Sequence, residues 1–141
     1  MVYLKTDEEV ELMRQSNILL SKLYGELAKH IKPGISTAEL DRIAEEYIRD
    51  NGGIPACKGY EDFPCALCTS VNEQIVHGIP SEKTVLRDGD IITIDSSIKL
   101  NGFHSDSAYT FPVGEVSDQV MRLLRTTKQA LYIGIEQAVT T

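Results

Sequence analysis

Two aspartates, Asp95 and Asp106, lie on either side of an Asn101-Gly102 pair in this 141-residue sequence. Asn-Gly is the strongest short signal for a two-residue hairpin turn, because both residues tolerate a positive φ. Such a turn places Ser97 opposite Asp106. Since side chains alternate across a strand, both aspartates are predicted to project from the same face of the hairpin.

Two carboxylates that share one space repel each other unless a positive charge lies between them. A divalent ion could supply that charge, and a pair of ions could jointly activate a water molecule. A solvated polar face is the commoner explanation of such a pattern taken alone. The opposite face of the hairpin is predicted to pack on a core, because it carries Ile92, Ile94, Ile98, Leu100, Phe103, Tyr109 and Phe111.

Thiol and imidazole groups offer other chemistry upstream of the hairpin. Cys57, Cys65, Cys68 and His77 could form a Cys3His zinc site, although their spacing is irregular and a second C-x-x-C pair is missing. A Cys–His nucleophile pair lacks an evident third residue to orient it. The three cysteines are odd in number and favour reduced thiols in the cytoplasm.

The elements that must position these residues can be read from capping and turn signals. Thr6 with Glu9, and Ser36 with Glu39, form capping boxes that predict the starts of two helices. Pro33-Gly34 and Asn51-Gly52-Gly53 predict their ends. After these helices the pattern predicts a loop over 54–64, short strands within 65–77, paired strands over 91–100 and 103–113, and a third helix after Ser117. The predicted class is α/β, with a curved antiparallel sheet and helices on one side.

Composition excludes several functions. The formal net charge of −7 argues against direct nucleic-acid binding, which needs clustered Lys and Arg. The longest apolar runs are too short to span a membrane, and the first thirty residues lack the pattern of a signal peptide. A cytoplasmic location is therefore expected.

Several motifs together resemble the type I methionine aminopeptidases, a family of metallopeptidases with the pita-bread fold. The resemblance covers essentially the whole sequence and implies the N-terminal half of that fold. Its motifs are Cys57 to Tyr60, Val76 to Pro80, Asp88 to Ile91, Ile94-Asp95 and Gly102 to Asp106. The sequence departs from the family pattern at Ser96-Ser97 and at Ser105, where Gly is usual before the second ligand.

The resemblance implies a role for each candidate site residue. Asp95 and Asp106 are expected to be metal ligands, and His77 a catalytic residue that contacts the substrate. His104 shares the aspartate face without being a ligand, and the backbone at Asn72 and Gln74 matches a monovalent-cation site of some relatives. The methionine side chain is expected to contact Cys57, Tyr60, Phe63 and Cys68.

The implied function is metal-dependent removal of the N-terminal methionine from peptides and nascent proteins, with ribosome association as a further expectation. The intact enzyme would use two divalent ions, Co, Mn, Fe or Zn. Residues 1–141 would form the N-terminal part of a single catalytic domain, inactive without the half that supplies one His and two Glu ligands. The alternatives are a non-catalytic half-domain that acts as an interaction module or a fragment, and a prolidase-like dipeptidase.

Overall fold

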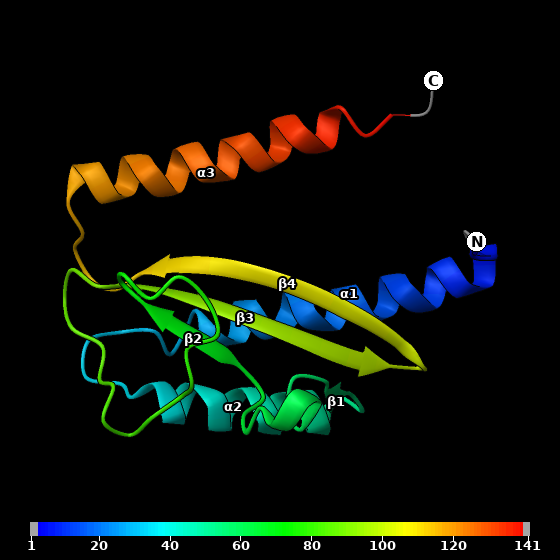
Figure 1. Ribbon diagram of the computed structural model, residues 1–141, viewed down its shortest axis with the longest axis horizontal. Helices are drawn as coiled ribbons and strands as arrows, with labels where there is room; N and C mark the ends of the chain where they lie inside the picture. Colours follow the sequence, from blue (N-terminus) through cyan, green and yellow to red (C-terminus); the bar gives the residue numbers. More distant parts are fainter. Residues whose placement is uncertain (1–2, 140–141) are drawn as a thin grey trace.

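The computed structural model describes residues 3–139, which form a small antiparallel sheet with helices against it (Figure 1). The sheet is built around a long hairpin, and two helices precede it in the chain. In chain order the elements are α1 (Asp7–Leu27), α2 (Thr37–Asp50), β1 (Ile54–Pro55), the 3-10 turn η1 (Tyr60–Asp62), β2 (Cys68–Val71), β3 (Ile91–Leu100), β4 (Phe103–Pro112) and α3 (Asp118–Glu136).

The starts of the first two helices follow their capping residues. Thr6 and Glu9 form the predicted reciprocal pair, because each side chain accepts a hydrogen bond from the other's backbone N–H. Ser36 caps α2 by accepting from the Glu39 N–H at 3.1 Å. The second capping box was only half correct. The predicted hydrogen bond from the Ser36 N–H to the Glu39 side chain was wrong, since the Glu39 carboxylate accepts instead from Arg42.

The hairpin sets the register of the sheet. β4 pairs with β3 along the full length of both strands, and Ser97 lies opposite Asp106 as predicted. Because β4 occupies one edge of β3, the shorter β1 and β2 follow one another along the other edge. The loop predicted over 54–64 was partly wrong, since β1 and η1 lie within it.

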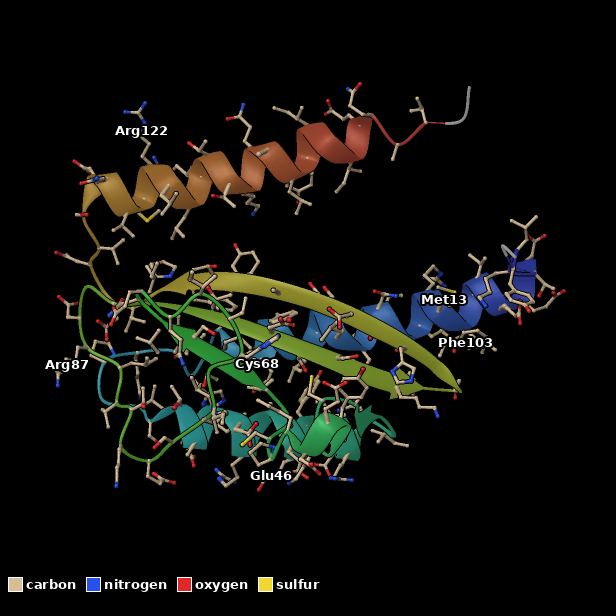
Figure 2. All side chains as sticks on the ribbon, in the orientation of Figure 1. Met13, Glu46, Cys68, Arg87, Phe103 and Arg122 are labelled. Carbon is tan, nitrogen blue, oxygen red and sulfur yellow. The ribbon has the colours of Figure 1, made fainter. Side chains whose placement is uncertain are left out.

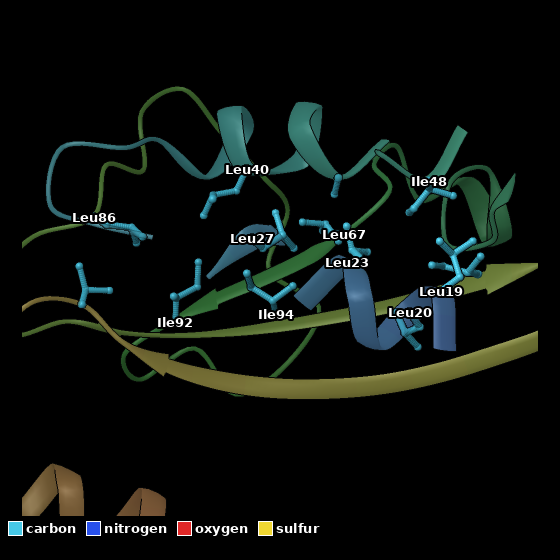
Figure 3. Packing of buried hydrophobic residues seen from close by; sticks show 13 residues of the cluster. Leu19, Leu20, Leu23, Leu27, Leu40, Ile48, Leu67, Leu86, Ile92 and Ile94 are labelled. Carbon is cyan, nitrogen blue, oxygen red and sulfur yellow. The ribbon is translucent and has the colours of Figure 1, made fainter. Parts of the chain in front are cut away.

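The core lies between the apolar face of the hairpin and the inner faces of α1 and α2 (Figure 3). Ile92, Ile94 and Ile98 of β3 are fully buried, so the predicted inward face of that strand is confirmed. Their partners are Leu19, Leu20, Leu23 and Leu27 of α1, Leu40, Ala44 and Ile48 of α2, and Leu67, Leu86 and Val113 from connecting segments.

The helix α3 lies apart from the other two helices, beyond β4 in Figure 1. It begins directly after Ser117 as predicted, and the Ser117 side chain caps it by accepting from the Val120 N–H at 3.3 Å. None of its residues is buried. Its one described aromatic contact with the sheet places the Lys128 ammonium 5.7 Å from the centre of the Tyr109 ring. No helix within residues 3–139 has the length and apolar character needed to cross a lipid bilayer.

Candidate functional site

A cavity of about 740 Å³ opens on the polar face of the hairpin, on the side away from the core. It is formed by β3, β4, the segment between β1 and β2, and the loop that follows β2. The residues expected as metal ligands, catalytic residue and methionine-binding residues all line it, and Cys68 marks its β2 side in Figure 2. The lining residues are Ala56, Cys57, Tyr60, Glu61, Phe63, Cys68, His77, Ile79, Asp95, Ser97, His104 and Asp106.

The two aspartates enter the cavity from adjacent strands. Asp95 lies at the middle of β3, opposite Cys68 on one side and Ala108 on the other. Asp106 lies on β4, opposite Ser97, so the two carboxylates are diagonal neighbours on one face. Burial raises the pKa of Asp95, and the nearby Asp106 charge raises it further. This is the electrostatic signature of a place that favours a cation.

The cysteines contribute packing surface to the cavity. Burial raises the pKa of the Cys57 thiol, and raises that of Cys68 to about 11. Both thiols are therefore neutral at physiological pH, which disfavours the nucleophile hypothesis. Cys65 does not line the cavity. Within residues 3–139, no group of three or more His, Cys, Asp or Glu side chains can hold a metal, so the Cys3His hypothesis was wrong.

The aromatic wall comes from an irregular turn between β1 and β2. Gly59 has a φ of 85°, and Glu61 and Asp62 also have positive φ, which wraps the chain tightly through η1. Tyr60 and Phe63 line the cavity from this turn. Tyr60 is 69% exposed, so this wall borders solvent. The cavity thus brings aromatic and sulfur-bearing side chains together with two carboxylates, and Cys68 lies directly opposite Asp95.

His77 reaches the cavity from the loop after β2. A positive charge on His77 lowers the pKa of Asp95, as expected for an imidazole and a carboxylate that line the same cavity. His104 also lines the cavity. His30 lies elsewhere, at the end of α1, where its Nε2 is 3.4 Å from Glu26. Asn72 and Gln74 do not line this cavity.

Glu61 was not singled out in the sequence, yet it lines the cavity together with the predicted residues. Its φ of 46° is unusual for a residue that is neither Gly nor Asn, so the sequence carries no turn signal at this position. Gly59 is the nearest cue, since it marks a tight turn two residues earlier. Ile79 and Ala56 were likewise missed as lining residues, because apolar loop residues carry no distinctive pattern.

Residues 11–140 match Metallopeptidase family M24, and the chain belongs to that family. Methionine aminopeptidase 1 of Bacillus subtilis is 51% identical over 138 residues, which are 98% of this chain and 55% of that protein. The methionine aminopeptidase of Clostridium acetobutylicum is 45% identical over 99% of this chain and 56% of its own length. The chain spans about half the length of the curated relatives it matches.

Solved structures agree with this assignment. The methionine aminopeptidase of Rickettsia prowazekii superposes with a TM-score of 0.91 at 32% identity, over 94% of this chain and 53% of that chain. A methionine aminopeptidase from Streptococci superposes with a TM-score of 0.93 at 29% identity, over 99% of this chain and 61% of that chain. The molecule is therefore half of a pita-bread fold, as the sequence predicted.

The donor set of the cavity suits part of a metal centre. Carboxylate oxygens are ligands for divalent ions of the first transition row, and both aspartates open into one space. A structural site for such an ion needs about four ligands. Asp95 and Asp106 therefore fit an incomplete set, to which further donors must be added for tight binding.

Proposed function

We propose that this chain is the N-terminal part of the catalytic domain of a methionine aminopeptidase, acting on N-terminal methionine of peptides and nascent proteins in the cytoplasm. The observation that carries the proposal is the meeting of Asp95 and Asp106 with the sulfur-bearing and aromatic wall in one cavity. The family membership and the methionine aminopeptidase relatives support the same activity.

Asp95 and Asp106 are the residues of this chain that would hold divalent ions such as Mn, Fe, Co or Zn. When bound, such ions lower the pKa of a water molecule and polarise the scissile carbonyl. The protein contributes a fixed pair of carboxylates on paired strands, whose backbone ladder keeps their spacing. A bound cation would relieve the mutual repulsion of the two carboxylates.

The sulfur-bearing and aromatic wall of the cavity would bind the side chain of the substrate. A thioether is polarizable and packs well against aromatic rings and small apolar groups. Cys57, Cys68, Tyr60 and Phe63 supply such groups at one wall. His77 lines the same cavity, so its imidazole could donate a hydrogen bond to the substrate amide as charge develops there.

We further propose that residues 1–141 have no peptidase activity alone. Two carboxylates leave the coordination of a divalent ion incomplete, and residues 3–139 hold no larger donor group. The remaining ligands and a general base would come from a second half of the domain. Turnover of a Met-Ala peptide by this chain with added Mn²⁺ or Co²⁺, lost in Asp95→Asn, would overturn this part of the proposal.

Metal binding by the carboxylate pair can be tested directly by NMR. Mn²⁺ broadens signals of nearby nuclei even when it binds weakly and exchanges rapidly. We expect it to broaden the ring signals of His77 and His104, which line the cavity, more than those of His30. The combined change Asp95→Asn and Asp106→Asn should abolish the difference, whereas Asp118→Asn, at the start of α3, should preserve it.

Equal broadening of all three histidines would contradict a metal site in the cavity. That result would favour the second candidate, a non-catalytic half-domain that acts through its surface. The specific observation behind this alternative is α3, which buries none of its residues and exposes Leu123, Leu131 and Ile135 by more than half.

A further inference from the structure

The loop after β2 returns to pair with the strand it has just left. The Thr69 N–H donates to the Gly78 carbonyl at 2.7 Å, and the Gly78 N–H donates to the Ser70 hydroxyl at 3.2 Å. Thr69, Ser70 and Gly78 are all buried. The two peptide units that flank the Gly78 Cα atom are thus both hydrogen-bonded to β2, immediately after His77.

Gly78 is required at this point for reasons of space. A Cβ atom built on it would lie 2.0 Å from the Thr69 carbonyl oxygen and 2.6 Å from the Gln74 Oε1. The first of these atoms belongs to the backbone of β2 and cannot move without disturbing the sheet. Any larger residue at position 78 must therefore push the loop away from Thr69.

His77 has a φ of 57°, in the left-handed region that non-glycine residues seldom occupy. Such a conformation persists only where neighbouring structure enforces it. The side chain of His77 is itself exposed, so packing of the imidazole does not enforce it. The two hydrogen bonds of Gly78 instead hold the backbone in place directly after His77.

We propose that Ser70 and Gly78 are positioning residues that hold His77 in its left-handed conformation and aim its imidazole into the cavity. They act on the substrate through His77 and do not contact the reacting atoms. The inference rests on the proposed function for the role of His77, while the conformational coupling itself can be measured without substrate or metal.

Ser70→Ala removes the hydroxyl that accepts from the Gly78 N–H. Gly78→Ala adds a Cβ atom that must push the loop away from Thr69. Ser70→Thr keeps the hydroxyl and should restore the wild-type behaviour. Ser16→Ala is a matched control, because Ser16 is also a fully buried, hydrogen-bonded serine but lies on α1. Gly25→Ala is the matched glycine control, since a Cβ there has no heavy atom within 4 Å.

Two measurements made without metal test whether Ser70 and Gly78 control the backbone conformation of His77. In Ser70→Ala, hydrogen exchange of the Gly78 amide should accelerate by roughly fivefold to tenfold, as expected for one lost hydrogen bond. In both Ser70→Ala and Gly78→Ala, the Cα and Cβ chemical shifts of His77 should move away from left-handed values. Ser70→Thr and both controls should leave these signals unchanged.

Wild-type His77 shifts in Ser70→Ala would overturn the inference, and so would equal His77 shifts in Ser70→Ala and Ser16→Ala. If Gly78→Ala fails to fold, the comparison of Ser70→Ala with Ser70→Thr and Ser16→Ala still tests the inference. Mn²⁺ broadening then separates this inference from the proposed function. We expect the variants to reduce broadening of His77 while His104 keeps it, whereas a wild type without selective broadening of either would count against the metal site alone.

Discussion

At the scale of single residues, Asp41 connects the second helix to the strand that carries Cys68. Its carboxylate accepts a hydrogen bond from the Leu67 N–H at 2.8 Å. Burial raises the pKa of Asp41, with the backbone hydrogen bonds of Leu67 and Ala66 opposing that rise. The chain therefore uses a partly desolvated acid to fix the start of β2 beside the cavity.

The raised pKa predicts how stability depends on pH. Between the ordinary and the raised value, the folded protein keeps the Asp41 proton while the unfolded chain loses it, so stability falls as pH rises through this window. Asp41→Asn keeps an acceptor and removes the charge. We expect the free energy of unfolding to rise by about 0.5 kcal/mol at pH 7, since solvent screens this half-buried group.

Urea unfolding of Asp41→Asn and wild type at several pH values measures this effect. The free energies of unfolding of the two proteins should converge below about pH 3, where the aspartate is protonated in both states. Asp118→Asn, on the exposed start of α3, serves as the control for removal of one carboxylate at the surface. If Asp41→Asn raises the free energy of unfolding by the same amount at all pH values, the result would contradict this explanation.

At the scale of elements, a pair of buried serines joins α1 to the hairpin. The Ser105 hydroxyl donates to the Ser16 carbonyl at 3.1 Å, and the Ser16 hydroxyl lies 3.0 Å from the Ser105 Oγ. Ser105 directly precedes Asp106, and its side chain is buried. Its side chain therefore requires the partner on α1, because an unpaired buried hydroxyl is destabilising.

A double-mutant cycle tests this pairing. Ser16→Ala and Ser105→Ala should each lower the free energy of unfolding by about 1–2 kcal/mol. Combined, they should be non-additive by at least about 0.5 kcal/mol, because each removes the same interaction. Ser16→Ala combined with Ser70→Ala should be additive, because Ser16 contacts Ile98 and Ser105 whereas Ser70 lies opposite Thr93, so the two share no partner. Additivity of the Ser16 and Ser105 changes would show that the two serines act independently.

The hairpin was predictable from sequence because two signals agreed. The Asn101-Gly102 turn fixes the pairing, and alternation of apolar and polar residues then decides which face meets the core. The placement of Asp95 and Asp106 on one polar face follows directly from those two facts. Local chemistry was sufficient here because every contact that matters lies within twenty residues or so along the chain.

The rest of the site depends on contacts that local patterns do not encode. Glu61 and His77 have positive φ without the Gly or Asn that usually signals it. For His77, the conformation is set by Gly78 packing against Thr69. The placement of Cys57 and Tyr60 near the aspartates depends likewise on β1 pairing with the far end of β3. Resemblance to the family named Cys57, Tyr60 and His77, which spacing alone did not, and neither named Glu61.

At the scale of the whole molecule, α3 presents an uncovered apolar surface. Leu124, Lys128, Leu131 and Ile135 follow one another at helical spacing, so they share a face. Lys128 lies over Tyr109, which directs that face toward the sheet. Leu131 and Ile135 are nonetheless 61% and 56% exposed. Contiguous apolar surface of this kind favours association.

We therefore expect the 141-residue chain to associate reversibly as its concentration rises. Sedimentation velocity over roughly a hundredfold range in concentration should show the average mass increasing. Leu131→Gln with Ile135→Gln should restore a monomer, because the changes remove apolar area without touching the core. Arg125→Gln, on the same helix, is the control. Unchanged association in the double variant would place the contact elsewhere.

The return of the chain from Val71 to Gly78 also determines which side of the sheet can recruit a foreign strand. The Thr69 N–H on the outer edge of β2 is already satisfied by Gly78, so no incoming peptide can pair there. Among the strands described, β4 pairs only with β3, and its outer edge is ten residues long. Strand addition, whether by a partner or during aggregation, is therefore directed to β4.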